Sequence, residues 1–317
     1  MTTILGFNKN HIEQARELAL ANYNEERSVV TDLPKIDTIP AEVYEDFADN
    51  GLGVAMFDGD KLLGFLCCYD PWDNAFDSNA RGTFVPIHAH GAVFENRSSI
   101  YKRLYQAAAE IWVKQKITYH AIALYAHNSQ AISSFFTNGF GLRCVDAVRS
   151  LENFEYQPYK GITFSELAKK DVAMIREMRK SHVIHLGESP CFMRSTSDAA
   201  EKWLNRAENR DSKIFVAIQN DKPIAYIEIT DDGETFASEV SSMMNICGAF
   251  CLPEYRGKDI VQGLLNHAIT ALKADGYDSL GVDFESFNPT ANGFWLKHFT
   301  AYTNSVVRRI DECALRE

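Results

Sequence analysis

The sequence predicts an α/β protein made of two consecutive copies of one fold, and three observations lead to this prediction. The chain has 317 residues, which is long for one ordinary domain and comfortable for two. Apolar stretches with strand-like and helix-like spacing alternate along it. The order of these stretches in the first half recurs in the second, as a tandem duplication would produce. We therefore predict one domain over residues 1–155 and another over residues 156–317, without a long flexible linker.

The elements of the first half follow from apolar periodicity and from turn residues. Ile12, Ala15 and Leu18 would share one face of a helix. Asp58-Gly59 is a typical hairpin turn, and Gly139 closes a helix. The predicted elements are a helix over 11–24, an irregular stretch over 31–50, hairpin strands over 54–57 and 62–69, a strand over 82–90, a helix over 98–116, a strand over 120–126, a helix over 128–138 and a strand over 142–151.

The second half repeats this order, and some positions match residue by residue. Val54-Ala55 corresponds to Val216-Ala217, Arg97 to Arg256, and Asn128 to Asn288. The predicted elements are a strand over 162–165, a helix over 170–181, an irregular stretch with a helix over 199–207, hairpin strands over 214–218 and 224–230, a strand over 243–252, a helix over 261–274, a strand over 280–283, a helix over 290–298 and a strand over 305–310.

Composition and charge exclude several classes of function. The chain is 46% hydrophobic with a formal net charge of -11, and both halves are acidic. Binding to nucleic acid or to an anionic membrane surface would need a clustered basic surface, so neither is expected. The seven cysteines are scattered and indicate reduced thiols in a cytoplasmic protein. We find neither a signal peptide nor an apolar run long enough to cross a membrane.

The stretch from Asn245 to Ala291 has the strongest functional pattern. An apolar, strand-like run ends near Leu252, and a polar turn containing Arg256, Gly257 and Lys258 leads directly into a helix. The first N–H groups of a helix lack intrahelical partners and lie at the positive end of its dipole. A strand, a short polar loop and a helix therefore predict a binding site for an anion such as a phosphate.

The order of elements and the sequence motifs resemble the GNAT acyltransferase family over both halves. CLPEYRGKDIVQGLLNHAITALKADGY is similar to the family's signature strand, pyrophosphate loop and helix, and LGVDFESFNPTANGFW to its next strand and Asn-x-x-Ala helix. HAIALYAHNSQAISSFFTNGF resembles the latter region in the first copy. The resemblance implies two GNAT-like domains, each a mixed, mostly antiparallel sheet flanked by helices. It also implies acetyl-coenzyme A as co-substrate.

The resemblance assigns coenzyme A binding to the second copy. The family's loop has the form Arg/Gln-x-x-Gly-x-Gly/Ala, and here Asp259 and Val261 replace both signature glycines. Asp259 adds a negative charge beside the expected phosphates, unless it serves only as the cap of the following helix. The candidate cofactor-binding residues are Cys251, Leu252, Arg256, Gly257, Lys258, Asp259, Ile260, Val261, Asn288 and Ala291.

The resemblance also implies a direct attack of an amine on the thioester. The thioester carbonyl would bind a backbone N–H near Cys251 or Leu252. The family's usual tyrosine acid, seven residues after the Asn of Asn-x-x-Ala, is replaced by Trp295, whose indole donates a hydrogen bond but is not a proton acid. Tyr302 is the alternative acid. Glu285, after the strand, is the candidate base, and an ordinary solvated carboxylate is the alternative reading.

The first copy is predicted to be degenerate and structural. Arg97-Ser-Ser-Ile-Tyr-Lys102 contains no glycine, and bulky side chains stand where the backbone would approach a phosphate. His88 and His90 would share one face of a strand, but two ligands do not make a metal site. We interpret them as a hydrogen-bonded pair and expect no metal.

The leading hypothesis is an N-acetyltransferase that transfers an acetyl group from acetyl-coenzyme A to a primary amine of a small molecule. The acidic surface would attract a cationic amine. The alternative is a non-catalytic GNAT-like protein that binds an acyl-coenzyme A or a metabolite, and a third hypothesis is transfer of a longer acyl or aminoacyl group. The acceptor and the oligomeric state, homodimer included, stay open.

Overall fold

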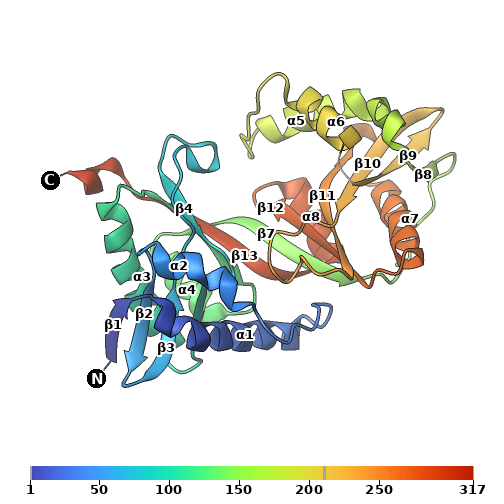
Figure 1. Cartoon of the computed structure of the whole chain (residues 1–317). Coiled ribbons are helices and arrows are strands. Elements are labelled where there is room, and N and C mark those ends of the chain that lie inside the picture. Colours follow the sequence, from blue (N-terminus) through green and yellow to red (C-terminus); the bar gives the residue numbers. More distant parts are fainter. Residues whose placement is uncertain (1, 210–211, 317) are drawn as a thin grey trace. The chain divides into compact units, whose positions relative to one another are not determined.

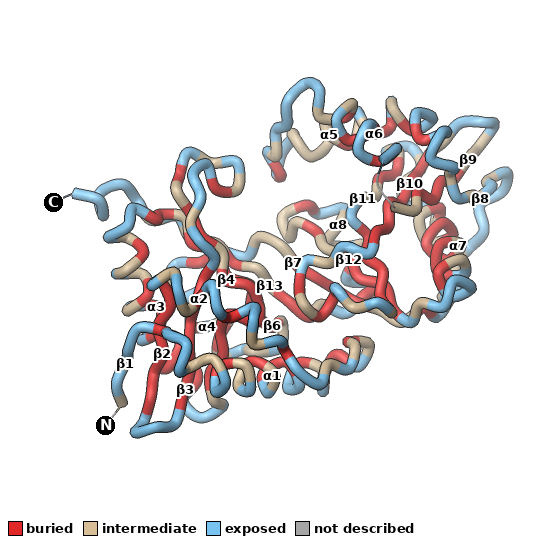
Figure 2. Tube along the Cα trace, in the orientation of Figure 1, coloured by how far each residue is buried: buried red, intermediate tan, exposed pale blue. Residues whose placement is uncertain are grey.

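The computed structural model describes residues 2–209 and 212–316, and its contacts divide the chain into two compact units (Figure 1). The first unit extends to Val145 and also contains the chain from Ala301 onward. The second unit is Asp146–Thr300. Each unit combines helices with mainly antiparallel sheet, so the predicted fold class is confirmed. In both units the buried residues concentrate on strands and on the helix faces that cover them (Figure 2).

The first unit contains the elements expected for one copy. They are β1 (Thr2–Gly6), α1 (Ile12–Val29), α2 (Glu45–Asp49), β2 (Val54–Asp58), β3 (Lys61–Leu66), β4 (Gly82–Val85), β5 (His90–Ala92), α3 (Arg97–Lys114), β6 (Tyr119–Tyr125), α4 (Ser129–Thr137), the beginning of β7 (Gly141–Ser150), and β13 (Thr300–Arg309) from its second residue. Strands β1, β2, β3 and β5 form an antiparallel sheet, and β4 pairs with β6 in parallel.

Helices α1 and α3 cover opposite faces of this antiparallel sheet. A side chain at Gly64 on β3 would meet Ile100 and Leu104 of α3. A side chain at Gly91, which pairs with the next residue of β3, would meet Leu18 of α1. Neighbouring strand positions face opposite sides, so the sheet lies between the two helices.

The second unit contains the second copy. Its elements are β8 (Thr163–Glu166), α5 (Arg176–Gly187), α6 (Ala199–Asn209), β9 (Lys213–Gln219), β10 (Lys222–Thr230), β11 (Met243–Cys251), α7 (Ile260–Ala274), β12 (Ser279–Glu285) and α8 (Pro289–His298). The strands lie in the order β12-β11-β10-β9-β8. Ile214 and Val216 of β9 pack in one core with α5 and α6, whereas Phe215 contacts His267 of α7, so helices cover both faces (Figure 1).

Strands β11 and β12 are parallel but pair over only a short length. Their register runs from Met243–Ser279 to Ile246–Val282 and then stops. Cys247 follows at once as the extra residue of a β-bulge, because Ile246 pairs with Ile229 and Gly248 with Glu228. A bulge bends its strand and increases the local twist. The end of β11 therefore follows β10 and leaves β12.

The structure differs from the predicted elements in three places. It adds β1, a mostly exposed edge strand that pairs with β2. The predicted strand over 82–90 is broken into β4 and β5 around Pro86, which has no N–H for a strand ladder. The predicted helix over 170–181 is a 3-10 helix, Lys169–Ile175, followed by α5.

The compact units also differ from the predicted boundary at residue 155. Strand β13 was expected to complete the second domain, but from Thr303 to Arg309 it pairs antiparallel with β6 of the first unit. Its Val306 is fully buried, and Ala126 N–H donates to the Tyr302 carbonyl over 2.9 Å. Sequence periodicity identifies a strand but does not say which partner strand it will pair with.

Replacing Val306 by Asp should therefore destabilise the first unit, because an unpaired charge would be buried. We expect faster hydrogen exchange in β6 and unchanged exchange in β9 and β10, measured by mass spectrometry on the full chain. Arg309→Ala, at the exposed end of the same strand, is the control and should leave both regions protected. Faster exchange confined to β9 and β10 would contradict the assignment of β13 to the first unit.

Candidate functional site

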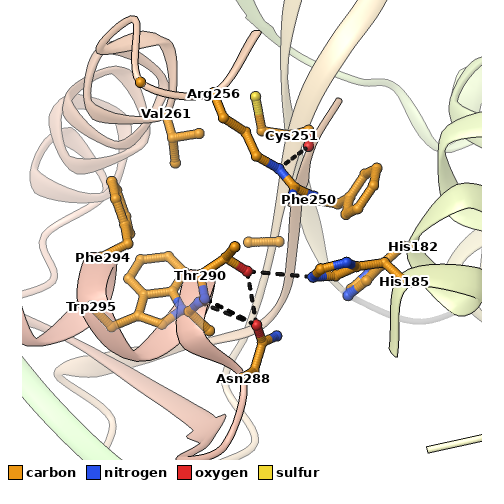
Figure 3. A pocket seen from close by; sticks show the side chains of 13 residues that line it. His182, His185, Phe250, Cys251, Arg256, Val261, Asn288, Thr290, Phe294 and Trp295 are labelled. Carbon is orange, nitrogen blue, oxygen red and sulfur yellow. Dashed lines mark hydrogen bonds between the residues drawn. The ribbon is translucent and has the colours of Figure 1, made fainter. Parts of the chain in front are cut away.

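A pocket of about 280 Å³ opens in the second unit beside the end of β11 (Figure 3). It is lined by the last residues of β11, the loop before α7, the start of α8 and one face of α5. Seven of the predicted site residues meet there: Cys251, Arg256, Gly257, Val261, Asn288, Ala291 and Trp295. The lining also contains residues that were not predicted, namely His182, His185, Ala249, Phe250, Thr290 and Phe294.

Strand β11 presents backbone donors to this pocket. Leu252 N–H donates to the Ile224 carbonyl of β10 over 3.0 Å. Hydrogen-bonded and non-hydrogen-bonded pairs alternate along an antiparallel ladder, so the N–H groups of Cys251 and Ala249 point away from β10. On that side β12 has already separated from β11. These two N–H groups are thus available to a carbonyl or amide, and Leu252, predicted as an alternative donor, is already engaged.

The loop between β11 and α7 keeps a backbone suited to an anion. Gly257 and Asp259 both have positive φ, 71° and 53°. Asp259 therefore adopts a conformation that favours glycine, and aspartate is among the residues that tolerate it. Arg256 lines the pocket. Its Nε donates to the Cys251 carbonyl over 3.1 Å, and its guanidinium lies 5.4 Å from the centre of the Phe250 ring.

The Asp259 carboxylate makes no side-chain cap at the N-terminus of α7. One oxygen accepts from the Gln262 side chain at 2.9 Å and the other from the Gln157 backbone N–H at 3.2 Å. The helix-capping alternative is therefore not what the structure shows. The carboxylate is bound by Gln157, in the segment before β8, and by Gln262. It therefore does not accept from the first N–H groups of α7.

Three further predicted cofactor residues lie near the pocket without lining it. Ile260 is buried as the first residue of α7. Lys258 is exposed, and its ammonium lies 5.4 Å from the ring centres of both Tyr159 and Tyr255. Leu252 packs against the core shared by α5, α6 and the sheet.

Helix α8 begins at the pocket with Asn288 as its cap. The Asn288 Oδ1 accepts from the N–H groups of Thr290 and Ala291, at 3.3 and 3.4 Å, and from the Thr290 hydroxyl at 2.8 Å. Pro289 starts the helix, where its missing N–H is harmless. About two turns after the cap, Trp295 is buried in the pocket wall, packed edge-on against Phe294 and Phe299.

His182 of α5 is a neutral hydrogen-bond donor. Its Nδ1 lies 3.0 Å from Arg179 Nη1 and 2.8 Å from the Tyr226 hydroxyl. Arginine only donates, so Nδ1 must accept and the ring proton must lie on Nε2. Burial, together with the nearby charge of Arg179, lowers the pKa of His182 to about 3. The ring stacks on Phe250 with 5.1 Å between ring centres.

His185, one turn further on, connects α5 with α8. Its Nε2 lies 3.3 Å from the Thr290 hydroxyl oxygen (Figure 3). That hydroxyl donates its proton to Asn288, so the imidazole must donate from Nε2 and keep its lone pair on Nδ1. Burial and the charge of Arg256 lower the pKa of His185. The i,i+3 spacing of His182 and His185 was a signal in the sequence that one helical face carries both rings.

The candidate base Glu285 is not in the pocket lining but at the end of β12. It follows Val282, the last residue of β12 that pairs with β11, by three positions. Asp283 stands between them and shares a face with Glu285. Burial, and the carboxylates of Glu234, Asp146 and Glu285, raise the pKa of Asp283 to about 7. The strands thus part beside Asp283, whose pKa of about 7 lets its carboxyl group exchange a proton near neutral pH.

Tyr302, the alternative acid, lies elsewhere. It is buried on β13 in the first unit, and its backbone bonds to the end of β6. Tyr302 is not among the residues that line the pocket of the second unit.

The corresponding region of the first unit is built differently. Arg97 does not correspond to Arg256, because Arg97 is the first residue of α3 whereas Arg256 precedes the cap of α7. The gap beside β5 is filled by His90, whose Nδ1 bonds the Tyr101 hydroxyl at 2.9 Å and whose Nε2 bonds the Ala123 carbonyl at 2.7 Å. Both ring nitrogens are thus engaged in hydrogen bonds within the protein.

The described part of the chain contains neither a candidate metal cluster nor a helix that could cross a membrane. Across residues 2–209 and 212–316, no three His, Cys, Asp or Glu side chains are grouped so that they could hold a metal ion. Within the same residues, no helix has the length and apolar composition needed to cross a membrane.

Comparisons with known proteins agree with this geometry. Residues 179–299, which contain the whole pocket, match the acetyltransferase (GNAT) family. No curated protein sequence matches the chain. A GCN5-related N-acetyltransferase from Sphaerobacter thermophilus is 13% identical with a TM-score of 0.60, covering 97% of this chain and 95% of that one.

A second similar structure is the GCN5-related glucosamine N-acetyltransferase region of a fungal multi-domain GH3 beta-N-acetylglucosaminidase. It is 14% identical with a TM-score of 0.52, covering 97% of this chain and 38% of the other. At these identities the similarity is one of fold. Each of the two units therefore has a GNAT-like fold, and residues 179–299 match the acetyltransferase (GNAT) family.

Proposed function

We propose that this protein is an acetyl-coenzyme A dependent N-acetyltransferase, with the second unit acting on a primary amine of a small molecule. The observation that carries the proposal is the convergence, in one pocket, of the parted strand β11, Arg256 and the N-terminus of α7. An acyl-coenzyme A carries a thioester at one end of an amide-containing arm and a pyrophosphate at the other. Its binding needs hydrogen-bond donors for the thioester and amide carbonyls, and a separate anion site for the pyrophosphate.

The cofactor would be held in two places. Its pyrophosphate would lie at the N-terminus of α7, against the backbone of Gly257 and the guanidinium of Arg256. Its pantetheine arm would follow the free edge of β11, where the N–H groups of Ala249 and Cys251 point into the pocket. The acyl carbonyl would then reach the place where β11 and β12 part.

The reaction would proceed by direct attack in a ternary complex. The acceptor arrives as an ammonium ion and must lose a proton before its nitrogen can form a bond to the acyl carbon. We assign this proton to the carboxylates of Asp283 and Glu285, of which the first has a pKa of about 7. The tetrahedral intermediate then releases the thiolate of coenzyme A, and a second proton of the former ammonium neutralises it.

Trp295 and His182 would serve as neutral donors around the thioester. Each lines the pocket, and each offers an N–H but no acidic proton. The proton balance needs no tyrosine acid, because the ammonium supplies the proton for the thiolate. The same carboxylates would also attract a cationic acceptor over a distance, in a protein whose net charge is -11.

The second candidate function is a non-catalytic protein that binds an acyl-coenzyme A. Trp295 at the place of the family's tyrosine is the observation that favours it. Calorimetry with acetyl-coenzyme A, followed by thiol release with a panel of polyamines, aminoglycosides and amino acids, separates the two. Binding with amine-dependent thiol release supports the enzyme, whereas binding without release by any amine favours the alternative.

The proposed pyrophosphate site predicts the effect of Gly257→Glu. A carboxylate beside the phosphates, on a backbone with φ of 71°, should abolish measurable binding of acetyl-coenzyme A by calorimetry. Gly257→Asn is the matched control, because asparagine tolerates this backbone and adds no charge, so binding should persist. Ser98→Glu, at the start of α3 in the first unit, should have almost no effect. Equal binding by the Glu and Asn variants would contradict this site.

The assigned proton acceptor predicts a pH profile. Asp283 has a raised pKa, so its group is protonated below about pH 7 and can accept a proton only above it. We expect kcat/KM to rise with pH through about 7, in addition to the deprotonation of the amine itself. Asp283→Asn should remove this rise, and both Asp283→Asn and Glu285→Gln should lower kcat by about 10²-fold or more.

Two further variants sharpen this measurement. Glu254→Gln, an exposed carboxylate near the loop, is the control and should leave the profile unchanged. His185→Asn tests the imidazole as a rival base. Because the pKa of His185 is lowered, a base at this position would give a rising limb below pH 6.5 that disappears in the variant. The assignment to the carboxylates would be overturned if His185→Asn lost the rising limb of the pH profile while Asp283→Asn kept the wild-type profile.

A further inference from the structure

The first unit has a pocket of its own beside the cap of α4, which is the counterpart of the cap of α8 in the second unit. It measures about 380 Å³ and lies between α1, the start of α3, the end of β6 and the start of α4. Asn128 caps α4 through the Ala131 N–H at 3.1 Å, as Asn288 caps α8. Tyr125 lines the pocket three residues before Asn128, the position that Glu285 occupies before Asn288.

This pocket lacks the features that would hold a coenzyme A pyrophosphate. The guanidinium of Arg97, which is buried, is bound by both carboxylate oxygens of Glu25 at 2.7 and 2.9 Å. The Ser98 N–H at the start of α3 already donates to the Gln130 side chain at 3.4 Å. The positive charge and a free helix N–H that a phosphate requires are therefore both used within the protein.

The charge that remains in the pocket is negative. Since Glu25 is balanced by Arg97, the surplus belongs to Glu26, whose side chain is almost completely buried. Glu26 accepts from the backbone N–H of His127 at 3.2 Å and from its Nδ1 at 2.7 Å. With histidine counted as neutral, the three charged side chains of the lining, Glu25, Glu26 and Arg97, carry a formal charge of -1 together. Burial raises the pKa of Glu26, and the bonds from His127 oppose this shift.

The wall of this pocket also contains a buried tyrosine, Tyr125, whose hydroxyl is unsatisfied. Its side chain is only 4% exposed, and its hydroxyl has no hydrogen-bond partner among the residues that the structure describes. An unsatisfied buried hydroxyl is unfavourable, and native proteins keep few of them. The hydroxyl belongs to a residue of the pocket wall, where a ligand could supply the missing partner.

We propose that the first unit binds a small organic primary ammonium compound in this pocket, with the ammonium near Glu26 and a hydrogen bond to the hydroxyl of Tyr125. The negative charge selects a cation, and a pocket of about 380 Å³ is of a size that suits a small organic molecule. This binding is independent of acyl transfer in the second unit. The first, degenerate copy would thus be a ligand-binding module that selects a cation, whereas a coenzyme A site selects an anion.

The test uses the full chain and two pairs of probes that differ only in charge: ethanolamine against ethylene glycol, and putrescine against 1,4-butanediol. Calorimetry measures the affinity, and hydrogen exchange with and without the probe locates it. We expect an amine to bind and to protect residues 22–29 and 125–131, while the matched diol does not. Protection confined to β12 and α8 would assign the amine to the second unit and overturn the proposal.

Two variants decide the roles of the residues. Tyr125→Phe should reduce amine affinity by about tenfold or more, yet leave the thermal midpoint unchanged or higher, because it removes an unsatisfied group. Glu26→Gln should abolish the preference for the amine over the diol. Tyr101→Phe is the control, since its hydroxyl is bonded to His90 away from the pocket lining, and amine binding should persist. Equal binding of amine and diol would refute the site. Unchanged affinity in Tyr125→Phe would also refute it, because this is the result expected if the Tyr125 hydroxyl is bonded to water and not to the ligand.

Discussion

The functional architecture of the second unit depends on the early separation of two parallel strands. Strands β11 and β12 stop pairing at Ile246 and Val282, and the bulge at Cys247 turns the rest of β11 aside. In a continuous sheet the backbone N–H groups at the end of β11 would bond to β12. Here they lie on an open edge, and the pocket forms beside that edge. The loop, the start of α7 and the cap of α8 supply the remaining walls.

The opening between the parted strands is kept in the second unit and filled by a side chain in the first. In the first unit, β4 pairs with β6 in parallel and β5 continues along β3, so the same separation exists. There a buried His90 links Tyr101 to the Ala123 carbonyl and occupies the space. Arg97 is matched with Glu25. The first unit therefore keeps the backbone of the fold, while its side chains change what it can bind.

Electrostatics distinguishes the sites more sharply than shape does. The pocket of the second unit combines Arg256 with two histidines whose pKa values are lowered, and carboxylates stand beyond it on β12. This charge distribution supports the proposal of an anionic cofactor on one side and a cationic acceptor on the other. The pocket of the first unit holds its arginine in an ion pair and retains a carboxylate.

The sequence by itself determined the fold class, the duplication and the stretch containing the site, because these follow from local periodicity and from loop residues such as Arg256 and Gly257. Seven of the predicted residues line one pocket, whereas His182 and His185 were missed, because the predicted helix ended at residue 181 and the actual helix continues to Gly187. Only the tertiary structure decided that β13 pairs with β6, that Asp259 turns its carboxylate toward Gln157, and that Tyr302 lies in the first unit. Strand partners and side-chain directions depend on contacts between distant residues, which local patterns do not encode.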